Sequence, residues 1–364
     1  MASLERIKII QKAIKNEELD AFIVNGNANN YYLTGVVDNL IKNTFYLVIL
    51  KNNFYFIGTN FHLKQIRKKI PQRNIRLADK SAGFGKIIVD ILKNLEKIGF
   101  ESHQFSYAKY ENFKKLLAGK KFMPFADIVE QTRSIKSAGE IALIKKAAVI
   151  TDKTFAELLK LIKPGVAEIC LKQKTIEIMN GFGATGIAFD PIVASGKNSA
   201  DPHYEGSNKK IKAGEMVVID IGARYKNYDA DMTRMVFVGK APTKYKNLYS
   251  LVLQTQQKAI AECKAGALPV QIFENAVNNF AAAGEDEFFT HGLGHGVGID
   301  IHELPNLSPK GQGMLENNMV FTVEPGLYHP GWGGIRIEDL CRMKNGKAEI
   351  LSRTPKNLIE IQVK

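Results

Sequence analysis

Cysteine is scarce in this sequence, and long apolar segments are missing from it. The three cysteines lie far apart among 364 residues, at Cys170, Cys263 and Cys341. An odd, dispersed set fits neither a disulfide framework nor a CxxC metal site. No apolar run approaches the ~18 residues of a membrane span, and the opening MASLERIKII leads into charged residues rather than a signal core. We therefore expect a soluble cytoplasmic protein that does not enter membranes.

Acidic residues are outnumbered by basic ones. The chain has 50 Lys and Arg against 37 Asp and Glu, a formal net charge of +13. Residues 1–130 hold 21 basic against 12 acidic residues, so most of the excess lies in the N-terminal third. A basic surface can attract nucleic acid. Because no stripe of Arg and Lys interleaved with aromatic residues is present, we interpret the excess as a solvated face and expect no nucleic-acid partner.

The length and the pattern of the chain predict two domains. Residues 1–130 alternate between helical spacing (LERIKIIQKAIKNEEL), extended runs (DAFIVNG and TFYLVILKNNFYFIG) and a return to helix at residues 83–99 (GFGKIIVDILKNLEKIG). This alternation indicates an α/β domain. A second domain spans residues 131–364, and the polar connector RSIKSAGE, residues 133–140, leads into its first helix.

The second domain contains one pattern written twice. Each copy has two helices followed by a strand that ends in an acidic residue: helices 139–162 and 166–180 before MVVIDIG, and helices 244–263 and 268–282 before MVFTVEPG. Aligning Asp220 with Glu324 also aligns Gly222 with Gly326. The duplication predicts two α+β halves that face each other across a pseudo-twofold axis, with a site between them.

Each copy also predicts an acidic hairpin. Asp220 and Asp231 are equidistant from a turn near residues 225–227, so we expect them opposite each other on antiparallel strands. Glu324 and Glu338 flank the turn YHPGWGG in the same way. Opposed like charges are destabilising, and an unpaired charge inside an apolar run is costly. A bound cation would relieve both costs, so we interpret the four acids as metal ligands.

The stretch THGLGHGVGIDIHELP, residues 290–305, places three histidines within twelve positions and threads four glycines among them. Glycine removes side-chain volume and lets other groups approach the backbone closely. We therefore expect both the backbone and the imidazoles to approach something small. Four carboxylates and one imidazole suit a pair of divalent cations of the Mn, Co or Zn type. Such a pair can clamp both sides of a hydrolytic transition state.

These motifs resemble a known family. The segments VIDIGARYKNYDADMTR, HGLGHGVGIDIHELP, VEPGLY and GIRIED are similar to those of the proline-specific metallopeptidases of the pita-bread fold, the Xaa-Pro aminopeptidases and Xaa-Pro dipeptidases (prolidases). LDAFIVNGNANNYYLTG and RSIKSAGEI resemble that family's creatinase-type N-terminal domain and its junction. The resemblance implies an α/β N-terminal domain followed by an α+β pita-bread (creatinase/aminopeptidase) catalytic domain with pseudo-twofold duplication.

The resemblance also implies the metal site. It assigns two divalent ions, taken as Mn²⁺ with Co²⁺ or Zn²⁺ as alternatives. The implied ligands are Asp220, Asp231, His295, Glu324 and Glu338. Asp231 and Glu338 would bridge both ions.

Catalytic roles follow from the same resemblance. Glu324 would also move protons, first from the attacking water and then towards the leaving proline nitrogen. His203 and His302 would flank the scissile carbonyl, bind the substrate and stabilise the oxyanion.

Three further residues receive supporting roles by resemblance. His291 would shape the pocket and relay protons, Arg336 would orient the bridging ligands or the substrate, and Tyr328 would line the substrate pocket. The other histidines are interpreted as structural: His62, His103 and His329.

Two features depart from the family pattern. Small hydroxyl or thiol residues often precede the second aspartate of the motif, whereas Ala230 and Asp229 precede Asp231 here. An extra carboxylate beside the site could change its metal affinity or pH dependence. The segment PHYEGS around His203 also differs from the expected forms, which bears on the shape of the substrate pocket.

The substrates implied are peptides with proline in the second position. The aminopeptidase and the dipeptidase differ in whether the site admits a chain beyond proline, and the sequence analysis leans to the aminopeptidase. A non-catalytic pita-bread binding or scaffold protein is the alternative from another class, and a metal-free, creatinase-like hydrolase is a third. Retention of all five ligands argues against both. The N-terminal domain argues against a methionine aminopeptidase. The resemblance further implies a homodimer.

Overall fold

The computed structural model of the chain describes residues 3–37, 45–60, 63–79 and 82–363. It divides into two compact units, Met1–Arg133 and Ser134–Lys364, which are described separately. Among the described residues, no helix combines the length and the apolar character that crossing a membrane requires.

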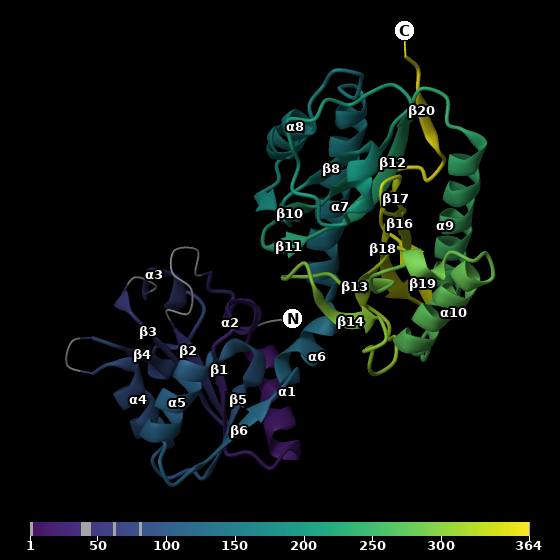
Figure 1. The fold of residues 1–364 in the computed structure, drawn as a ribbon. Helices are drawn as coiled ribbons and strands as arrows, with labels where there is room; N and C mark the ends of the chain where they lie inside the picture. The colour runs from purple at the N-terminus through teal and green to yellow at the C-terminus, as the bar shows by residue number, and fades with distance from the viewer. Residues whose placement is uncertain (1–2, 38–44, 61–62, 80–81, 364) are drawn as a thin grey trace. The chain divides into compact units, whose positions relative to one another are not determined.

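The first unit is built on a six-stranded mixed sheet in the order β4-β3-β2-β1-β5-β6. Figure 1 shows this sheet between α1 on one side and α4 and α5 on the other. All four residues of β1 are buried, as expected for a strand covered on both faces. The strands are β1 (Ala21–Val24), β2 (Tyr46–Leu50), β3 (Phe54–Gly58), β4 (Ile75–Leu77), β5 (Lys97–Glu101) and β6 (Lys121–Phe125). The helices are α1 (Ser3–Asn16), α2 (Asn27–Thr34), α3 (Leu63–Ile66), α4 (Phe84–Leu92), α5 (Tyr107–Leu116) and α6 (Ile128–Ser134).

One expected helix of this unit is shorter than its sequence pattern indicates. The segment 83–99 begins as α4, but the helix ends at Leu92 and its last three residues already belong to β5. Gly99 fits its place in β5, because a Cβ there would lie 2.6 Å from the Leu19 side chain and 2.8 Å from that of Phe22. A strand residue without a side chain is required where these two groups cover the sheet.

The second unit has the two-copy organisation that the sequence predicts. Figure 1 shows α7 and α8 on one side of its central strands and α9 and α10 on the other. The helices are α7 (Ala138–Leu159), α8 (Glu168–Gly181), α9 (Thr243–Glu262) and α10 (Pro269–Ala281). The helix α7 begins with a capping box, in which Ser137 and Glu140 bond each other's backbone N–H groups.

Four sheets form the strand layer of this unit. The first half contributes β12-β9-β8, which β20 from the end of the chain extends, and β11-β10-β7; the second half contributes β14-β13-β15-β18-β19 and the hairpin β16-β17. The first-half strands are β7 (Gly186–Ile187), β8 (Ile192–Ser195), β9 (Met216–Ile221), β10 (Ala223–Tyr225), β11 (Tyr228–Asp229) and β12 (Met232–Val238). The others are β13 (Gly294–Gly296), β14 (Glu303–Leu307), β15 (Val320–Val323), β16 (Gly326–His329), β17 (Gly333–Arg336), β18 (Asp339–Lys344), β19 (Lys347–Ile350) and β20 (Ile359–Ile361).

Two apolar cores lie in this unit, and the second of them includes residues from both halves. Phe155 and Leu158 of α7 pack with Ile219 of β9 in one cluster. Phe280 of α10 packs with Phe321 of β15 in the other. Burying such side chains stabilises a fold by about 25 cal/mol for each Å² of apolar surface removed from water. The two cores position β9, β12, β15 and β18. Asp220 lies within β9, and Asp231, Glu324 and Glu338 adjoin the ends of β12, β15 and β18.

Candidate active site

A cavity of about 770 Å³ opens in the second unit. Its wall is formed by residues from both halves. The lining residues are Lys172, Phe189, Asp190, Ile192, Pro202, His203, Tyr204, Glu205, Gly206, Asp220, Asp231, His291, Gly292, Gly294, His295, Ile301, His302, Glu324, Arg336 and Glu338. All five expected metal ligands and four of the expected catalytic or substrate-binding residues therefore lie on one surface.

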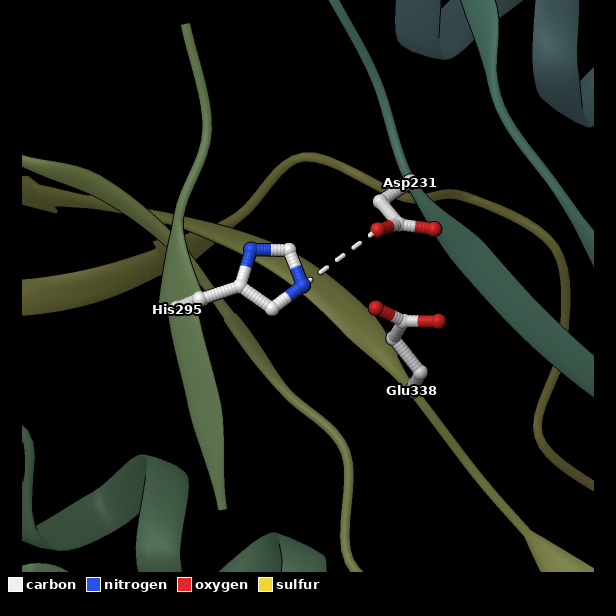
Figure 2. A group of neighbouring side chains, drawn as sticks. All are labelled: Asp231, His295 and Glu338. Atoms are coloured by element: carbon white, nitrogen blue, oxygen red, sulfur yellow. Dashed lines mark ion pairs between the residues drawn. The ribbon is translucent and has the colours of Figure 1, made fainter. Parts of the chain in front are cut away.

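Three of these side chains converge closely. Figure 2 shows Asp231, His295 and Glu338 pointing towards one another from three different strand segments. One potential ligand atom from each lies within 4.8 Å of those of the other two. His295 is on β13, Asp231 follows β11, and Glu338 precedes β18. The two halves of the duplication thus contribute to the same cluster.

The His295 ring joins this cluster to Glu324. Its Nε2 lies 3.2 Å from Glu324 Oε1 and 3.6 Å from Asp231 Oδ2. Its Nδ1 lies 3.1 Å from the carbonyl oxygen of Gly296, which can only accept a hydrogen bond. This contact orients the ring so that Nε2 faces the carboxylates. Metal-binding histidines are oriented in this way by a backbone carbonyl.

The first acidic hairpin differs in register from the expectation. Lys226 and Asn227 have φ of 50° and 65°, which is the two-residue turn that suits the twist of a hairpin. This turn lies later in the chain than expected and pairs Asp220 with Thr233 rather than with Asp231. Residues two apart on a strand share a face, so Asp231 remains on the same side as a diagonal neighbour of Asp220.

The second acidic hairpin has the expected register. Val323 pairs with Asp339 across β15 and β18, so the adjoining residues Glu324 and Glu338 come opposite each other. The two hairpins are joined by a backbone hydrogen bond of 3.2 Å from Glu338 N–H to the Thr233 carbonyl.

Burial controls the titration of the cluster. Burial raises the pKa of Asp231 well above its usual range, and the charges of Glu338 and Asp220 raise it further. The pKa of Glu338 is raised by burial and by the same kind of repulsion, and burial raises that of Asp220 as well. Burial also acts on Glu324, but the hydrogen bond and positive charge of His295 outweigh it and lower the pKa of Glu324 to about 2.

The residues present fit a site for divalent cations. Within the described part of the chain, one buried oxygen each of Asp220, Asp231 and Glu338 has no hydrogen-bond partner. Buried polar atoms are almost always paired, and buried charges are paired or bind metals. Carboxylates with one imidazole are the donor set that Mn²⁺, Co²⁺ and Zn²⁺ accept, whereas a thiolate-rich set would favour zinc alone.

Two threonines that the sequence analysis did not single out orient these ligands. Thr233 Oγ1 donates to Glu338 Oε2 at 2.7 Å. Thr322 Oγ1 donates to Glu324 Oε1 at 3.0 Å and accepts from the His295 backbone N–H at 3.0 Å. Each threonine lies two residues from a ligand on the same strand face. That alternation is the signal in the sequence that could have identified them.

Arg336 lies at the centre of a buried hydrogen-bond network. Its guanidinium donates to Asp220 Oδ2 at 2.6 Å, to Thr233 Oγ1 at 3.0 Å and to the Tyr328 hydroxyl at 2.6 Å. The Tyr328 hydroxyl lies 2.9 Å from His291 Nε2. Arg336 therefore ties the first hairpin to the second.

The network also determines the state of His291. Its Nδ1 lies 2.6 Å from the carbonyl of Gly292, so Nδ1 carries the proton and Nε2 accepts from the Tyr328 hydroxyl. Burial lowers the pKa of His291, in keeping with a neutral ring. Both ring nitrogens are engaged, which suits the shaping of the pocket better than the relay of protons. Tyr328 differs from the expectation, because it is buried and is absent from the cavity wall formed by the described residues.

His203 and His302 both line the cavity and are exposed to it. The ring of His302 lies edge-on to that of His295, with centroids 4.2 Å apart. Burial and the nearby positive charge of His295 lower the pKa of His302. Of the histidines interpreted as structural, His62 lies outside the described residues, and His329 stacks on Phe288 with centroids 3.9 Å apart.

The two departures from the family pattern have structural explanations. Asp229 is fully buried and bound on both oxygens by Arg224, at 2.6 and 2.7 Å. Arg224 therefore offsets the charge of Asp229. Asp229 is also not among the described residues of the cavity wall. In PHYEGS, the Tyr204 and Ser207 hydroxyls both donate to the buried carboxylate of Glu168, at 2.8 and 3.2 Å. These hydroxyls anchor the loop that carries His203.

The glycines around His295 answer a packing requirement. A Cβ on Gly294 would lie 2.1 Å from the Thr322 carbonyl oxygen, and one on Gly296 would lie 2.1 Å from that of Leu304. β13 therefore runs so close to its neighbours that only glycine fits on either side of His295. The glycines bring the imidazole to the cluster by permitting close backbone approach.

Comparisons with known proteins agree with this geometry. Residues 142–345 match Metallopeptidase family M24, and residues 6–135 match the Creatinase/Prolidase N-terminal domain. The chain is 33% identical over 356 residues to the Xaa-Pro dipeptidase of Pyrococcus horikoshii, which covers 98% of this chain and 99% of that one.

Solved structures give the same result. The Xaa-Pro dipeptidase from Bacillus anthracis superposes with a TM-score of 0.92 at 32% identity, over 99% of this chain and 100% of that one. The X-Pro aminopeptidase from Thermotoga maritima superposes with a TM-score of 0.84 at 32% identity, over 96% and 100%. The chain therefore belongs to metallopeptidase family M24, with a creatinase-type N-terminal domain and a pita-bread catalytic domain, and is an enzyme of that family whose relatives are proline-specific peptidases.

Proposed function

We propose that this enzyme hydrolyses the peptide bond before a proline in the second position and releases the N-terminal residue. The observation that carries the proposal is the convergence of four carboxylates and one imidazole in a cavity that is also lined by His203 and His302. An Xaa-Pro bond is a tertiary amide without an N–H, so its recognition needs a site dedicated to it. The names of similar proteins support this specificity.

The expected ligands are the residues that would hold two divalent cations: Asp220, Asp231, His295, Glu324 and Glu338. When bound, such ions supply Lewis-acid polarisation of the scissile carbonyl and lower the pKa of the attacking water. We retain Mn²⁺ as the proposed metal. Thr233 and Thr322 hold one oxygen each of Glu338 and Glu324, and the other oxygen of Glu338 is buried without a hydrogen-bond partner among the described residues.

Glu324 is the proposed proton carrier. Its carboxylate lines the cavity, with Oε1 3.2 Å from His295 Nε2. An ionised carboxylate in the cavity wall can accept a proton from the attacking water and return it to the proline nitrogen as the C–N bond breaks. The leaving group needs that proton because a proline amide anion is a poor leaving group.

His203 and His302 are the proposed substrate-positioning residues. Both are exposed to the cavity, and their ring nitrogens can donate to the oxygen of the scissile carbonyl as its negative charge develops. Arg336 and His291 have their nitrogens committed to protein partners, so we assign them to orienting Asp220 and shaping the wall.

Among Xaa-Pro peptidases we propose the dipeptidase, although from the sequence alone we favour the aminopeptidase. The support is the set of names: full-length relatives at 33% identity and the structure with a TM-score of 0.92 are Xaa-Pro dipeptidases. The aminopeptidase is the second candidate, supported by the Thermotoga maritima structure with a TM-score of 0.84. A homodimer and a cytoplasmic location complete the proposal.

The test is hydrolysis by metal-reloaded protein. The protein is stripped with chelator, reloaded with Mn²⁺ and assayed on the dipeptide Ala-Pro and the tripeptide Ala-Pro-Gly. We expect chelation to abolish activity, Mn²⁺ to restore it, and the dipeptide to be the better substrate. Because loss of a residue that merely orients a ligand costs about 10- to 100-fold, Asp231→Asn should cost at least about a hundredfold.

Asp90→Asn provides the matched control, since Asp90 is an exposed residue of the other unit. Faster cleavage of the tripeptide would replace the dipeptidase with the aminopeptidase. If neither peptide is cleaved and calorimetry detects no Mn²⁺ binding, the catalytic proposal is wrong and a binding protein becomes the better interpretation.

A further inference from the structure

Two basic side chains line the described cavity, Lys172 and Arg336. Arg336 is committed to the protein, because its guanidinium donates to three buried partners and the residue is only 3% exposed. Lys172, on α8, lies beside two exposed residues of the wall, Asp190 and Glu205. The two residues therefore differ in what they can offer to a substrate.

The ammonium of Lys172 lies at the cavity wall and donates two hydrogen bonds to described residues. Its Nζ donates to Asp190 Oδ2 at 3.2 Å and to the carbonyl oxygen of Glu205 at 3.0 Å. Its side chain is 14% exposed, whereas that of Asp190 is 77% exposed. The stem passes Gly206, where a Cβ would lie 3.6 Å from Lys172 Cδ. An ammonium has three donors, so one is left for a ligand even before Asp190 moves away.

The charges around Lys172 make it important for an anionic substrate. Six carboxyl groups also belong to the wall: Asp190, Glu205, Asp220, Asp231, Glu324 and Glu338. A substrate that carries a carboxylate is repelled by this wall wherever no cation compensates. Bound metal ions would compensate at the ligand cluster, and Lys172 provides the positive charge on α8.

We propose that Lys172 binds a carboxylate of the substrate, which replaces Asp190 as the anionic partner of its ammonium. This inference rests on the proposed function. Asp190 is largely exposed, so water solvates its carboxylate when a substrate displaces it and the cost is low. The carboxylate can come from two sources: the C-terminus of an Xaa-Pro dipeptide, or an acidic side chain in the residue before proline. The first source would make Lys172 a determinant of dipeptidase specificity.

Two matched substrate pairs distinguish the sources. Ala-Pro and its amide Ala-Pro-NH₂ differ in the C-terminal carboxylate, and Glu-Pro and Gln-Pro differ in the side chain. We would measure kcat/KM for all four with Mn²⁺-loaded wild type, Lys172→Met and Lys172→Arg. Where cleavage of the amide is too slow to follow, its inhibition constant against Ala-Pro replaces kcat/KM.

We expect Lys172→Met to lower the preference for the carboxylate member of one pair by about tenfold to a hundredfold, the range for a hydrogen bond to a charged group. Loss of the Ala-Pro preference assigns the C-terminus, and loss of the Glu-Pro preference assigns the side chain. Lys172→Arg should keep most of the preference, because it keeps the charge. The control is Lys174→Met on the same helix, since Lys174 is 53% exposed and pairs with Glu177.

Other results separate the two proposals. If the wild type cleaves Ala-Pro but Lys172→Met leaves both preferences unchanged, Lys172 binds no substrate carboxylate and the inference is wrong while the proposed function stands. An equal loss on all four substrates has the same meaning, because it reports a structural role. If the metal-loaded wild type cleaves none of them, the proposed function itself fails, and the inference fails with it.

Discussion

At the scale of single residues, Arg336 determines how the two halves meet. The carboxylate of Asp220 comes from the first half and the hydroxyl of Tyr328 from the second, and one guanidinium bonds both. Tyr328 responds to its surroundings, since burial raises its pKa to about 12 and it stays neutral. The planar guanidinium of arginine carries five N–H donors in a fixed fork, so it reaches three separated partners that a compact ammonium could not span.

We expect Arg336→Lys to weaken Mn²⁺ binding by about 10- to 100-fold, because lysine cannot hold Asp220, Thr233 and Tyr328 together and residues that orient metal ligands typically have effects of this size. Isothermal titration with Mn²⁺ measures the change. Arg342→Lys on β18 is the matched control, because Arg342 bonds Asn318 at 2.7 Å and does not line the described cavity. An unchanged affinity in Arg336→Lys would show that the network is structural only.

At the scale of elements, the loop that carries His203 depends on the first turn of α8. Glu168 is fully buried at the start of that helix. It accepts hydrogen bonds from Ser195 Oγ and backbone N–H, both at 2.7 Å, and from the Tyr204 hydroxyl at 2.8 Å. One carboxylate thus joins the helix, the end of β8 and the loop, and it positions His203 without touching the substrate.

We expect Glu168→Ala to lower kcat/KM for Ala-Pro while Mn²⁺ affinity stays within about threefold of wild type, because the ligands lie on other segments. Each buried donor left without a partner costs about 1–3 kcal/mol, so thermal unfolding should also shift downward. Glu168→Gln keeps one acceptor and should recover part of the activity. If both variants lose Mn²⁺ binding in parallel with activity, Glu168 supports the whole unit rather than the loop.

The hairpins show how far pattern leads at this scale. The helices of the second unit lie within a few residues of their expected bounds, because apolar spacing along a helix reflects the face that it buries. The register of the first hairpin was wrong because it depends on where the turn is centred. Lys226 and Asn227 take positive φ, and a lysine in the sequence does not predict that conformation. Alternation still placed Asp220 and Asp231 on one face.

At the scale of the whole molecule, the chain is two units with separate cores. The first unit has its own buried charge, Glu101 at the end of β5, which accepts hydrogen bonds from the backbone N–H groups of Asn25 and Gly26 at 2.6 and 2.7 Å. Burial is the largest influence on this carboxyl, and despite these bonds its pKa is raised to about 7. The stability of the first unit is therefore coupled to pH independently of the catalytic cluster.

The sign of that coupling follows from the raised pKa. Below pH 4.5 Glu101 is protonated in both the folded and the unfolded chain, and its contribution to stability is complete. Between pH 4.5 and about 7 the unfolded chain releases this proton while the folded chain keeps it. About 3 kcal/mol of the free energy of unfolding is lost over this range. Hydrogen exchange of the β1 and β5 amides between pH 4 and 8, corrected for intrinsic rates, measures this. Glu101→Gln should flatten the profile, and an equally steep profile in that variant would assign the effect to another group.

The sequence by itself determined the two-copy organisation, and it identified the acids and the histidine that meet in the cavity. Acids placed inside apolar runs, with glycines around a histidine, predict buried ligands because an unpaired charge could not persist there. It also determined the membership of the family, because these motifs occupy separated segments in the right order. For the same reason the ligand residues could be named before their positions were known.

Tertiary structure alone decided how those residues are supported. Thr233, Thr322 and Arg336 act across strands from both halves, and Lys172 reaches the cavity from a helix of the first half. Periodicity reports which face of an element a residue occupies, but not which atom of another element it meets. Such contacts arise only when the halves pack, since each hydrogen bond depends on the register and distance between segments that lie about a hundred residues apart.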